Sequence, residues 1–283
     1  MRLIPPAAFL RLGGAGSIAL LTIVLFTALG WLGPLMFGLE PYVLSDELLA
    51  APAWLSGQGG LLGNDDLGRD QLARLVYGAR HSLSIGMLVV LIACSLGSLL
   101  GLYAAAYRGI VDRLVMRLVE VLMTLPSILL AIIVVAILGP GLINAMFAVA
   151  LVAIPRFVRV VRAVALAEMQ KQYILAARTC GASTQRIIWS ELLPNCLGAI
   201  IAQAALGISD AILEIAALGF LGLGAQPPTA EWGAMLADSR AFIASEPQLM
   251  LLPGLCILAT VVSFNLLGDA LQDCLDPRLE MRR

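Results

Sequence analysis

The sequence predicts an all-α membrane protein with six transmembrane helices. Its composition is 60% hydrophobic and only 13% charged, with a mean hydropathy of +0.93, whereas soluble domains are about 45–50% apolar and about 25% charged. The apolar residues form long runs, and the alternating pattern of a membrane β-barrel is absent. Because the lipid core offers the backbone no hydrogen-bond partners, such runs must be helices.

The apolar runs divide the chain into spans and loops. A helix needs about 20 apolar residues to cross the hydrocarbon core, and the predicted spans cover residues 16–37, 82–107, 113–138, 142–164, 196–224 and 248–270. We expect a cytoplasmic N-terminus with the first helix (1–37), an external loop (38–81), a five-helix core (82–270) and a cytoplasmic tail (271–283). Within the core lie a polar loop at 173–195 and a second external loop at 225–247.

The first predicted helix begins like a secretory signal peptide, because Arg2 and Arg11 precede an apolar run. That run is too long for the apolar part of a signal peptide, and no clear small-residue cleavage site precedes Pro34. We therefore expect this segment to be retained as a transmembrane helix.

The first external loop, 38–81, is rich in glycine, proline and acidic residues. Asp65 and Asp66 precede an amphipathic stretch, as acids at a helix N-terminus do. A plain surface linker is one interpretation. The dense Gly/Asp/Arg pattern beside aromatic residues favours an ordered external cap.

The next three helices contain small residues and prolines at informative positions. Gly97 and Gly101 are four residues apart, which predicts close packing against another helix. Pro126 and Pro155 lie inside predicted spans and are expected to kink or locally unwind them.

Three arginines follow at intervals of three residues, at positions 156, 159 and 162. They share one face near the predicted cytoplasmic interface. The preferred interpretation is contact with anionic lipid or extension of the side chains toward the headgroups.

The polar loop reads YILAARTCGASTQRIIWSELLPN over 173–195. Ala176 and Ala177 favour helix without adding bulk, so that another protein can approach closely. Gly181 can take the left-handed conformation that ends this helix, and Ser183 or Thr184 can cap the next one. Pro194 suits a helix start, where its missing N–H costs nothing. The alternative is an ordinary interfacial helix–turn–helix.

The fifth predicted span carries two carboxylates, Asp210 and Glu214, near its middle. They are four residues apart and share a face. A carboxylate at the bilayer centre costs at least about 2.5 kcal/mol on insertion scales. The pair must therefore face a partner helix or a watery cavity, or share a proton. A hydrogen-bonded pair at a subunit interface and direct substrate contact in a translocation pathway both stay open.

The end of the chain supplies one more loop and span. Pro227 and Pro228 end the fifth helix, and Trp232 in the loop 225–247 suits an interfacial anchor or a short re-entrant helix. The last span holds Pro253 and Gly254.

The orientation follows from the basic residues, which concentrate on the cytoplasmic side. With both termini in the cytoplasm, all but four of the 18 Lys and Arg residues lie on or near that side. The external four are Arg69, Arg74, Arg80 and Arg240. The inverse topology would reverse this asymmetry.

Several kinds of chemistry are not expected of this chain. Lys171 is the only lysine and no Gly-Lys-Ser/Thr sequence exists, so there is no P-loop for ATP. The single histidine, His81, is expected to be a capping or interfacial residue, and no metal or hydrolase cluster is evident. We expect neither an enzyme nor a nucleic-acid partner, and no cofactor in this chain.

Several sequence blocks carry a family resemblance. They are LLGNDDLGRDQLARLVYGARHSL at 61–83, LPN at 193–195, ALGFLGLGAQPPTAEWGAML at 217–236 and FNLLGDALQDCLDPR at 264–278. With the polar loop and the six-helix pattern, the chain closely resembles the C-type permease subunits of bacterial dipeptide, oligopeptide and nickel ABC importers, and most of all their dipeptide members. Leu175 departs from the general permease pattern, in which many relatives have Glu.

The resemblance implies a type I ABC importer permease fold in which the polar loop forms a cytoplasmic coupling helix. It implies a homologous B-type permease partner, two cytoplasmic ATPase subunits that bind ATP and Mg, a periplasmic solute-binding protein, and a lipid environment in the bacterial inner membrane. The residues expected to couple to the ATPases are Tyr173, Ala176, Ala177, Arg178, Gly181, Ala182, Leu193 and Pro194.

The substrate and two other functions stay open at this point. Dipeptides or short peptides are preferred, with nickel, haem, aminolevulinate, opines or antimicrobial peptides as alternatives. A proton-coupled transporter or channel would use Asp210 and Glu214 as a relay. A membrane enzyme or scaffold without transport is the other alternative. The polar loop favours the importer over both.

Overall fold

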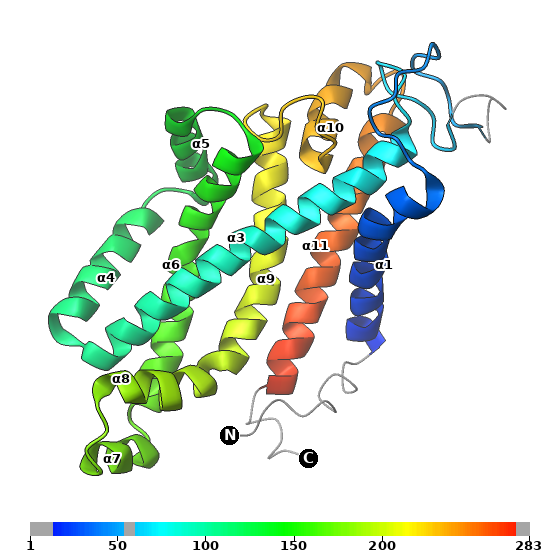
Figure 1. Ribbon diagram of the computed structural model, residues 1–283. Coiled ribbons are helices and arrows are strands. Elements are labelled where there is room, and N and C mark those ends of the chain that lie inside the picture. The colour runs from blue at the N-terminus through cyan, green and yellow to red at the C-terminus, as the bar shows by residue number, and fades with distance from the viewer. Residues whose placement is uncertain (1–13, 54–59, 276–283) are drawn as a thin grey trace.

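A computed structural model describes residues 14–53 and 60–275 and is helical throughout, apart from loops and one isolated bridge between Asn64 and Asp70 (Figure 1). This confirms the predicted all-α class. The long helices are α1 (Gly14–Phe37), α3 (Gln71–Tyr107), α4 (Gly109–Met123), α5 (Ser127–Leu138), α6 (Leu142–Glu168), α9 (Leu193–Phe220) and α11 (Gln248–Leu275). The short ones are α7 (Gln172–Thr179), α8 (Thr184–Ile187), a π turn (Ile188–Leu192), α10 (Trp232–Asp238) and a 3-10 turn (Ser239–Phe242).

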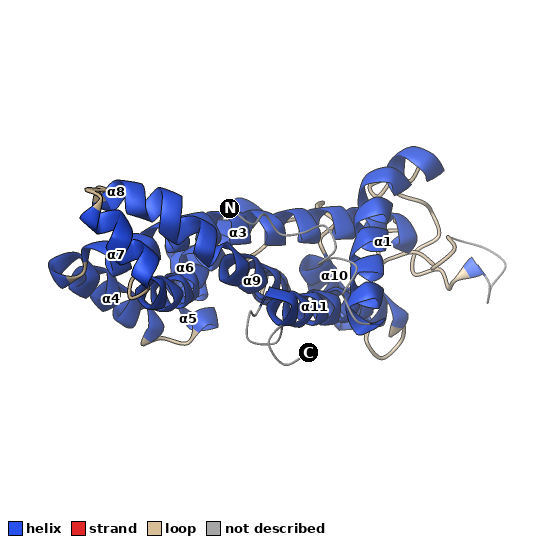
Figure 2. Cartoon of the chain, turned by 90° about the horizontal axis from the view of Figure 1, so that it is seen from below, coloured by secondary structure: helices blue, strands red, loops and turns tan. Residues whose placement is uncertain are grey.

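The helices form an elongated slab with α4 near one end and α1 near the other (Figure 2). Helix α3 runs diagonally across α6 and α9 (Figure 1). The first turn of α1, the last turn of α11 and the α7–α8 segment lie at one end of the molecule. Helices α5 and α10 and the loop before α3 lie at the opposite end. The loops therefore alternate between two ends, as expected of a multi-pass protein.

Four helical segments among the described residues are long and apolar enough to cross a bilayer: Gly14–Phe37, Gln71–Tyr107, Thr184–Phe220 and Gln248–Cys274. Helices α4 and α5 would add a fifth span only as a pair bent by 91°. The predicted span over 113–138 is therefore present as two helices with a sharp bend between them. Helix α6 is a further long helix, of 27 residues.

The two prolines behave differently. Pro126 directly precedes α5, at the break that separates it from α4. A proline disfavours helical backbone in the residue before it, which explains a break at this place, and this confirms the expectation. Pro155 lies inside α6, which continues unbroken from Leu142 to Glu168. The unwinding expected there is not observed.

Helices α3 and α6 approach closely through glycine, as the Gly97/Gly101 spacing predicts. A Cβ on Gly97 would lie 2.5 Å from Cβ of Phe157, and one on Gly101 would lie 2.8 Å from the carbonyl oxygen of Val158. Both distances are too short for real side chains. Only glycine therefore permits this contact.

Helix α3 begins at Gln71, well before the start expected near residue 82. Its N-cap is Asp70, whose carboxylate accepts a hydrogen bond from the backbone N–H of Ala73 at 3.0 Å. The assignment of Asp65 and Asp66 to a helix N-terminus is therefore wrong.

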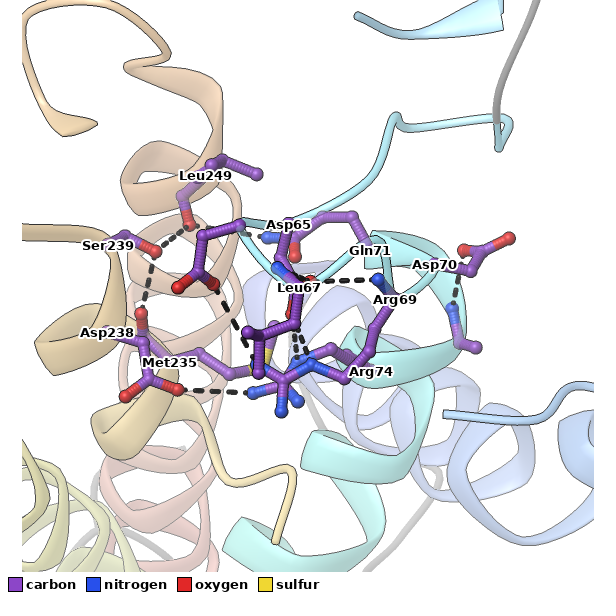
Figure 3. Close-up of polar contacts among 12 residues, drawn as sticks. Asp65, Leu67, Arg69, Asp70, Gln71, Arg74, Met235, Asp238, Ser239 and Leu249 are labelled. Carbon is purple, nitrogen blue, oxygen red and sulfur yellow. Dashed lines mark hydrogen bonds and ion pairs between the residues drawn. The ribbon is translucent and has the colours of Figure 1, made fainter. Parts of the chain in front are cut away.

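Asp65 instead joins a buried charge cluster at the end of the molecule that holds α10 (Figure 3). Its carboxylate accepts from Nε of Arg69 at 2.6 Å and lies 3.4 Å from Nε of Arg74. Arg74 also donates through Nη2 to Asp238, at the end of α10, at 3.3 Å. The cluster fastens the described residues just before α3 to α3 and α10, as expected of an ordered loop.

Trp232 begins the short helix α10 and is completely buried rather than placed at a membrane interface. Its Nε1 donates to the carbonyl of Leu75 at 3.1 Å, and its ring occupies the space beside Gly78. The carboxylate of Glu231 caps α10 and accepts a hydrogen bond from Ser82 at 2.8 Å. Burial raises the pKa of Glu231. The expected short helix is present, and the anchor interpretation is wrong.

Candidate functional site

The polar loop folds into two short helices joined by a tight turn. Gly181 has φ of +82°, the left-handed conformation expected there. The N–H of Gly181 donates to the carbonyl oxygen of Arg178 at 3.0 Å, and the N–H of Ala182 donates to the carbonyl oxygen of Ala177 at 3.0 Å. These two bonds form the Schellman motif that ends helices at a left-handed residue. The turn is therefore defined by the backbone and requires no bulky side chain.

The second short helix starts as predicted but continues without a break. Ser183 is its N-cap and accepts from the N–H of Arg186 at 3.3 Å. The helix then passes through a π turn, where the N–H of Leu193 reaches back to the carbonyl of Ile188. Pro194 follows at once in the first turn of α9, near the start of the helix as expected. The wider π turn leaves room for the proline ring, which has no N–H to donate to the preceding turn.

The loop is seated on the ends of α3 and α6 by buried aliphatic side chains. Ile174 of α7 and Ile187 and Ile188 of the second helix are buried in one apolar cluster. The cluster also contains Leu102 from α3 and Val161 from α6. Apolar burial therefore holds the loop against the ends of α3 and α6.

A buried carboxylate fixes the first turn of the loop. Glu168, the last residue of α6, accepts from the Tyr173 hydroxyl at 2.7 Å and from Nζ of Lys171 at 2.6 Å. Burial and the neighbouring Glu168 carboxylate raise the pKa of Tyr173. The phenol therefore stays protonated and donates its hydrogen bond throughout the physiological range.

Two stacked tyrosines at the end of α3 contact the second helix of the loop. The rings of Tyr103 and Tyr107 lie 5.9 Å apart and nearly parallel. Tyr103 donates to Oε1 of Gln185 at 3.1 Å, and Nε2 of Gln185 donates to the Tyr107 hydroxyl at 3.4 Å. Sequence reasoning missed both tyrosines, because they are about 80 residues from Gln185 in the sequence. It also missed Glu168, which lies only five residues before Tyr173.

The outer surface of the loop combines small, apolar and basic side chains. Leu175 is 64% exposed and Trp189 is 49% exposed. Ala176 and Arg178 are exposed beside them, while Ala177 and Ala182 are half-buried. Exposed apolar side chains on a short, firmly seated helix are typical of a surface that binds another protein.

The two predicted carboxylates lie far along α9 from this loop, at its middle. Asp210 forms an ion pair with Nη1 of Arg156, which lies at the middle of α6. The side chains of Arg156 and Asp210 are 45% and 47% exposed. Glu214 lies one turn further along α9, beside the hydroxyl of Ser127 at the start of α5. The expected shared face is present, and α6 supplies a counter-charge that the sequence did not predict.

The lipid interpretation of the arginines is wrong for two of the three. Arg156 pairs with Asp210, and Arg162 pairs with Asp112 of α4, to which its Nη2 donates at 2.7 Å. Among the described residues, the one polar contact of the Arg159 side chain is from its Nη1 to the sulfur of Met123, at 3.5 Å.

The structure therefore brings the predicted residues together in two places. The loop residues share one end of the molecule, and Asp210 and Glu214 share a shallow pocket with Arg156, Gln203 and Gly207. Helix α6 joins the two places, since Arg156 lies at its middle and Glu168 at its end.

Comparison with known proteins decides the family. Residues 97–281 match the family described as binding-protein-dependent transport system inner membrane component. The chain belongs to this family. The matched range contains the loop, its seat on α3 and α6, and the Arg156–Asp210 pair.

Relatives of this transport component are similar over almost their whole length. The chain is 46% identical over 273 residues to the di/tripeptide transport system permease protein DppC of Pseudomonas aeruginosa, covering 95% of this chain and 89% of the relative. It is 47% identical over 272 residues to the dipeptide transport system permease protein DppC of Escherichia coli K12, covering 95% and 90%.

A solved structure supports the fold of the transport component. The MetNI methionine ABC transporter, in an inward-facing conformation, matches with a TM-score of 0.60 over 71% of this chain and 96% of the matched chain. The identity is 21%, so this match concerns the fold alone.

Proposed function

We propose that this chain is the permease subunit of an ATP-driven importer for dipeptides and other short peptides. Family membership and the firmly seated loop with its small, exposed outer surface support a membrane component that is moved by a separate motor. Peptide as the substrate rests on the similarity to relatives whose names state dipeptide or di/tripeptide transport.

The loop 173–195 is proposed to contact the ATPases. Ala176, Ala177, Gly181 and Ala182 leave little bulk at the turn, so that a partner backbone can approach. Tyr173 and Leu193 hold the loop from the inside through Glu168 and the apolar cluster. Arg178 supplies an exposed positive charge, and Pro194 lies in the first turn of α9, just after the π turn. ATP and Mg are proposed to bind in the partner ATPases.

Asp210 and Glu214 are proposed to line the translocation pathway, together with Arg156. Half-exposed charges at the middle of α6 and α9 cannot face lipid without a cost of at least about 2.5 kcal/mol per charged side chain. A water-filled path between this chain and a homologous B-type permease would remove that cost.

The orientation is also a proposal. The described ends of α1 and α11 lie at the same end as the loop (Figure 1). If the loop meets cytoplasmic ATPases, both ends of the chain face the cytoplasm of a bacterial inner membrane. A periplasmic solute-binding protein would then deliver substrate to the end that holds α10.

Reconstitution of the complete importer tests the proposal. This chain would be placed in proteoliposomes with its B-type permease and two ATPases, and the peptide-loaded binding protein added. We expect ATP-dependent accumulation of labelled dipeptide, and no turnover by the purified chain alone. A complex with ATPase subunits unable to hydrolyse ATP is the matched control. Transport of nickel or haem without transport of dipeptide would contradict the substrate assignment.

A further inference from the structure

The face that carries the Arg156–Asp210 pair has one unpaired charge on either side of it. Glu214 and Arg159 form no ion pair with any other described residue. Glu214 lies beside the Ser127 hydroxyl, and Arg159 contacts the Met123 sulfur. Both side chains are at least partly exposed. Each is therefore available to an oppositely charged group from outside the chain.

The two unpaired charges are displaced in opposite directions along the molecule. Helices α6 and α9 are antiparallel (Figure 1). Glu214 is one turn beyond Asp210 toward the end that holds α10, and Arg159 is one turn beyond Arg156 toward the end that holds α7. The face is therefore negative toward one end and positive toward the other.

The spacing of these charges matches a short peptide. Four residues of α9 and three of α6 advance about 6 Å and about 4.5 Å along their axes, so that Glu214 and Arg159 are displaced by about 10 Å. An extended peptide spans at most about 3.3–3.6 Å per residue, which gives about 7 Å for two residues and about 10 Å for three. The flexible side chains of both residues cover the difference.

We propose that a peptide crosses this face in one orientation, with its carboxylate toward Arg159 and its ammonium group toward Glu214. The inference rests on the proposed peptide substrate. A guanidinium binds a carboxylate through two parallel hydrogen bonds, and a carboxylate accepts from an ammonium group. The intervening Arg156–Asp210 pair keeps Glu214 and Arg159 from neutralising each other. The carboxyl end of the peptide would therefore reach the cytoplasm first.

The other source of counter-charges is the second permease. If its side chains pair with Arg159 and Glu214, these residues hold the complex together and do not contact substrate. The two possibilities predict different consequences when one charge is removed, because an interface residue changes assembly and a pathway residue changes uptake at normal assembly.

Photo-crosslinking in the complete reconstituted importer tests the orientation. Two dipeptides carry benzoylphenylalanine either at the first or at the second position, and labelled peptides are mapped by mass spectrometry. We expect the second-position probe to label α6 and α4 near Arg159 and Met123, and the first-position probe to label α9 and α5 near Glu214 and Ser127. Reversed labelling, or the same labelling by both probes, would overturn the inference.

Substitutions test the role of the charge. We expect Arg159→Gln to lower uptake about tenfold or more at unchanged complex yield, since a charge-assisted hydrogen bond is lost. Arg159→Lys should lower uptake less, because it keeps the charge but not the two parallel hydrogen bonds. Arg113→Gln, an exposed arginine in the first turns of α4 and outside the loop, is the control for general loss of charge. Reduced complex yield with Arg159→Gln would assign the guanidinium to the permease interface instead. Failure of the wild-type complex to import any peptide would refute the proposed function, a separate outcome.

Discussion

The indole of Trp232 fills the space in which Gly78 lacks a side chain. A Cβ on Gly78 would lie 2.6 Å from Cδ1 and 2.8 Å from Nε1 of that ring. The contact joins α10 to α3. A second close contact joins α10 to α9, because a Cβ on Gly233 would lie 2.5 Å from Cα of Ala216. The short helix is therefore inserted between two long ones and not laid on the surface.

Gly78→Ala is expected to destabilise the chain by about 1–3 kcal/mol, the usual cost of overpacking. The added methyl group must displace a buried ring that donates a hydrogen bond to Leu75. Thermal unfolding of the purified permease measures the effect. Gly254→Ala is the matched control, because a Cβ there would lie 3.9 Å from the nearest atom, in the Leu236 side chain. Equal melting temperatures for the two variants would contradict the packing argument.

Gly181→Val is expected to uncouple the ATPases while leaving the chain inserted in the membrane. Within this chain the space around Gly181 is open, so the strain inside the chain comes from the left-handed backbone, which costs an ordinary residue about 1–2 kcal/mol. The added side chain also occupies the surface proposed for the partner. Gly181→Asn should keep more of the coupling than Gly181→Val, since asparagine tolerates this conformation. The coupling is measured as the ATP hydrolysis rate of the complex with and without loaded binding protein. Full stimulation of the Val variant would remove the turn from the coupling mechanism.

Removing one charge of the Arg156–Asp210 pair is expected to do more harm than removing both. Asp210→Asn and Arg156→Gln each leave the other member of the pair without its partner at mid-helix, whereas the double variant removes both charges of the pair. A double-mutant cycle on the melting temperature of the assembled complex gives the coupling, which we expect to lie between about 0.5 and 3 kcal/mol. Additive losses would show that the two side chains do not interact in the complex.

Glu214→Gln is expected to assemble normally and to transport poorly. Glutamine preserves the shape and a hydrogen bond to Ser127 but removes the charge. Complex yield and uptake are measured on one preparation. Full uptake at normal yield would exclude the charge of Glu214 from the mechanism, and failed assembly would make it an interface residue.

Reporter fusions are expected to place the C-terminus in the cytoplasm and the loop before α3 outside. A phosphatase reporter inserted beside Asp46, an exposed position of that loop, should be active. A phosphatase fused after Arg283 should be inactive, and a fluorescent protein that folds only in the cytoplasm should be bright there. The opposite readings would invert the topology.

The class of the fold was predictable from the sequence because bilayer thickness sets the length of apolar runs. Local turns were also predictable, because they depend on the properties of single residues. Only a residue without a Cβ takes the conformation of Gly181 at no cost, and a serine oxygen at position 183 can reach the next free N–H groups.

Long-range pairing was not predictable in the same way. Arg156 and Asp210 are 54 residues apart in sequence, and Arg74 and Asp238 are 164 apart. Nothing in the local pattern around either residue identifies its partner, because the pairing depends on how α6 packs against α9 and α3 against α10. The sequence spacing of Arg156, Arg159 and Arg162 suggested lipid as their common partner, which was wrong for Arg156 and Arg162.

The two prolines also show that local sequence rules predict only part of the structure. Local rules state that Pro126 and Pro155 disturb a helix, but not by how much. Pro126 directly follows the residues where α4 ends, so the chain bends sharply. Pro155 is buried within α6, and the helix around it stays continuous.

The length of α3 has a mechanical consequence. With 37 residues it extends about 55 Å, well beyond the roughly 30 Å hydrocarbon core. Its first turns hold the Arg74–Asp238 contact, and its last hold the Tyr103–Gln185 contact. A lever arm of this length that tilts by about 10° about one end displaces the other by roughly 10 Å. A small change of angle at the loop would therefore displace the opposite end of α3 by about the length of a short peptide.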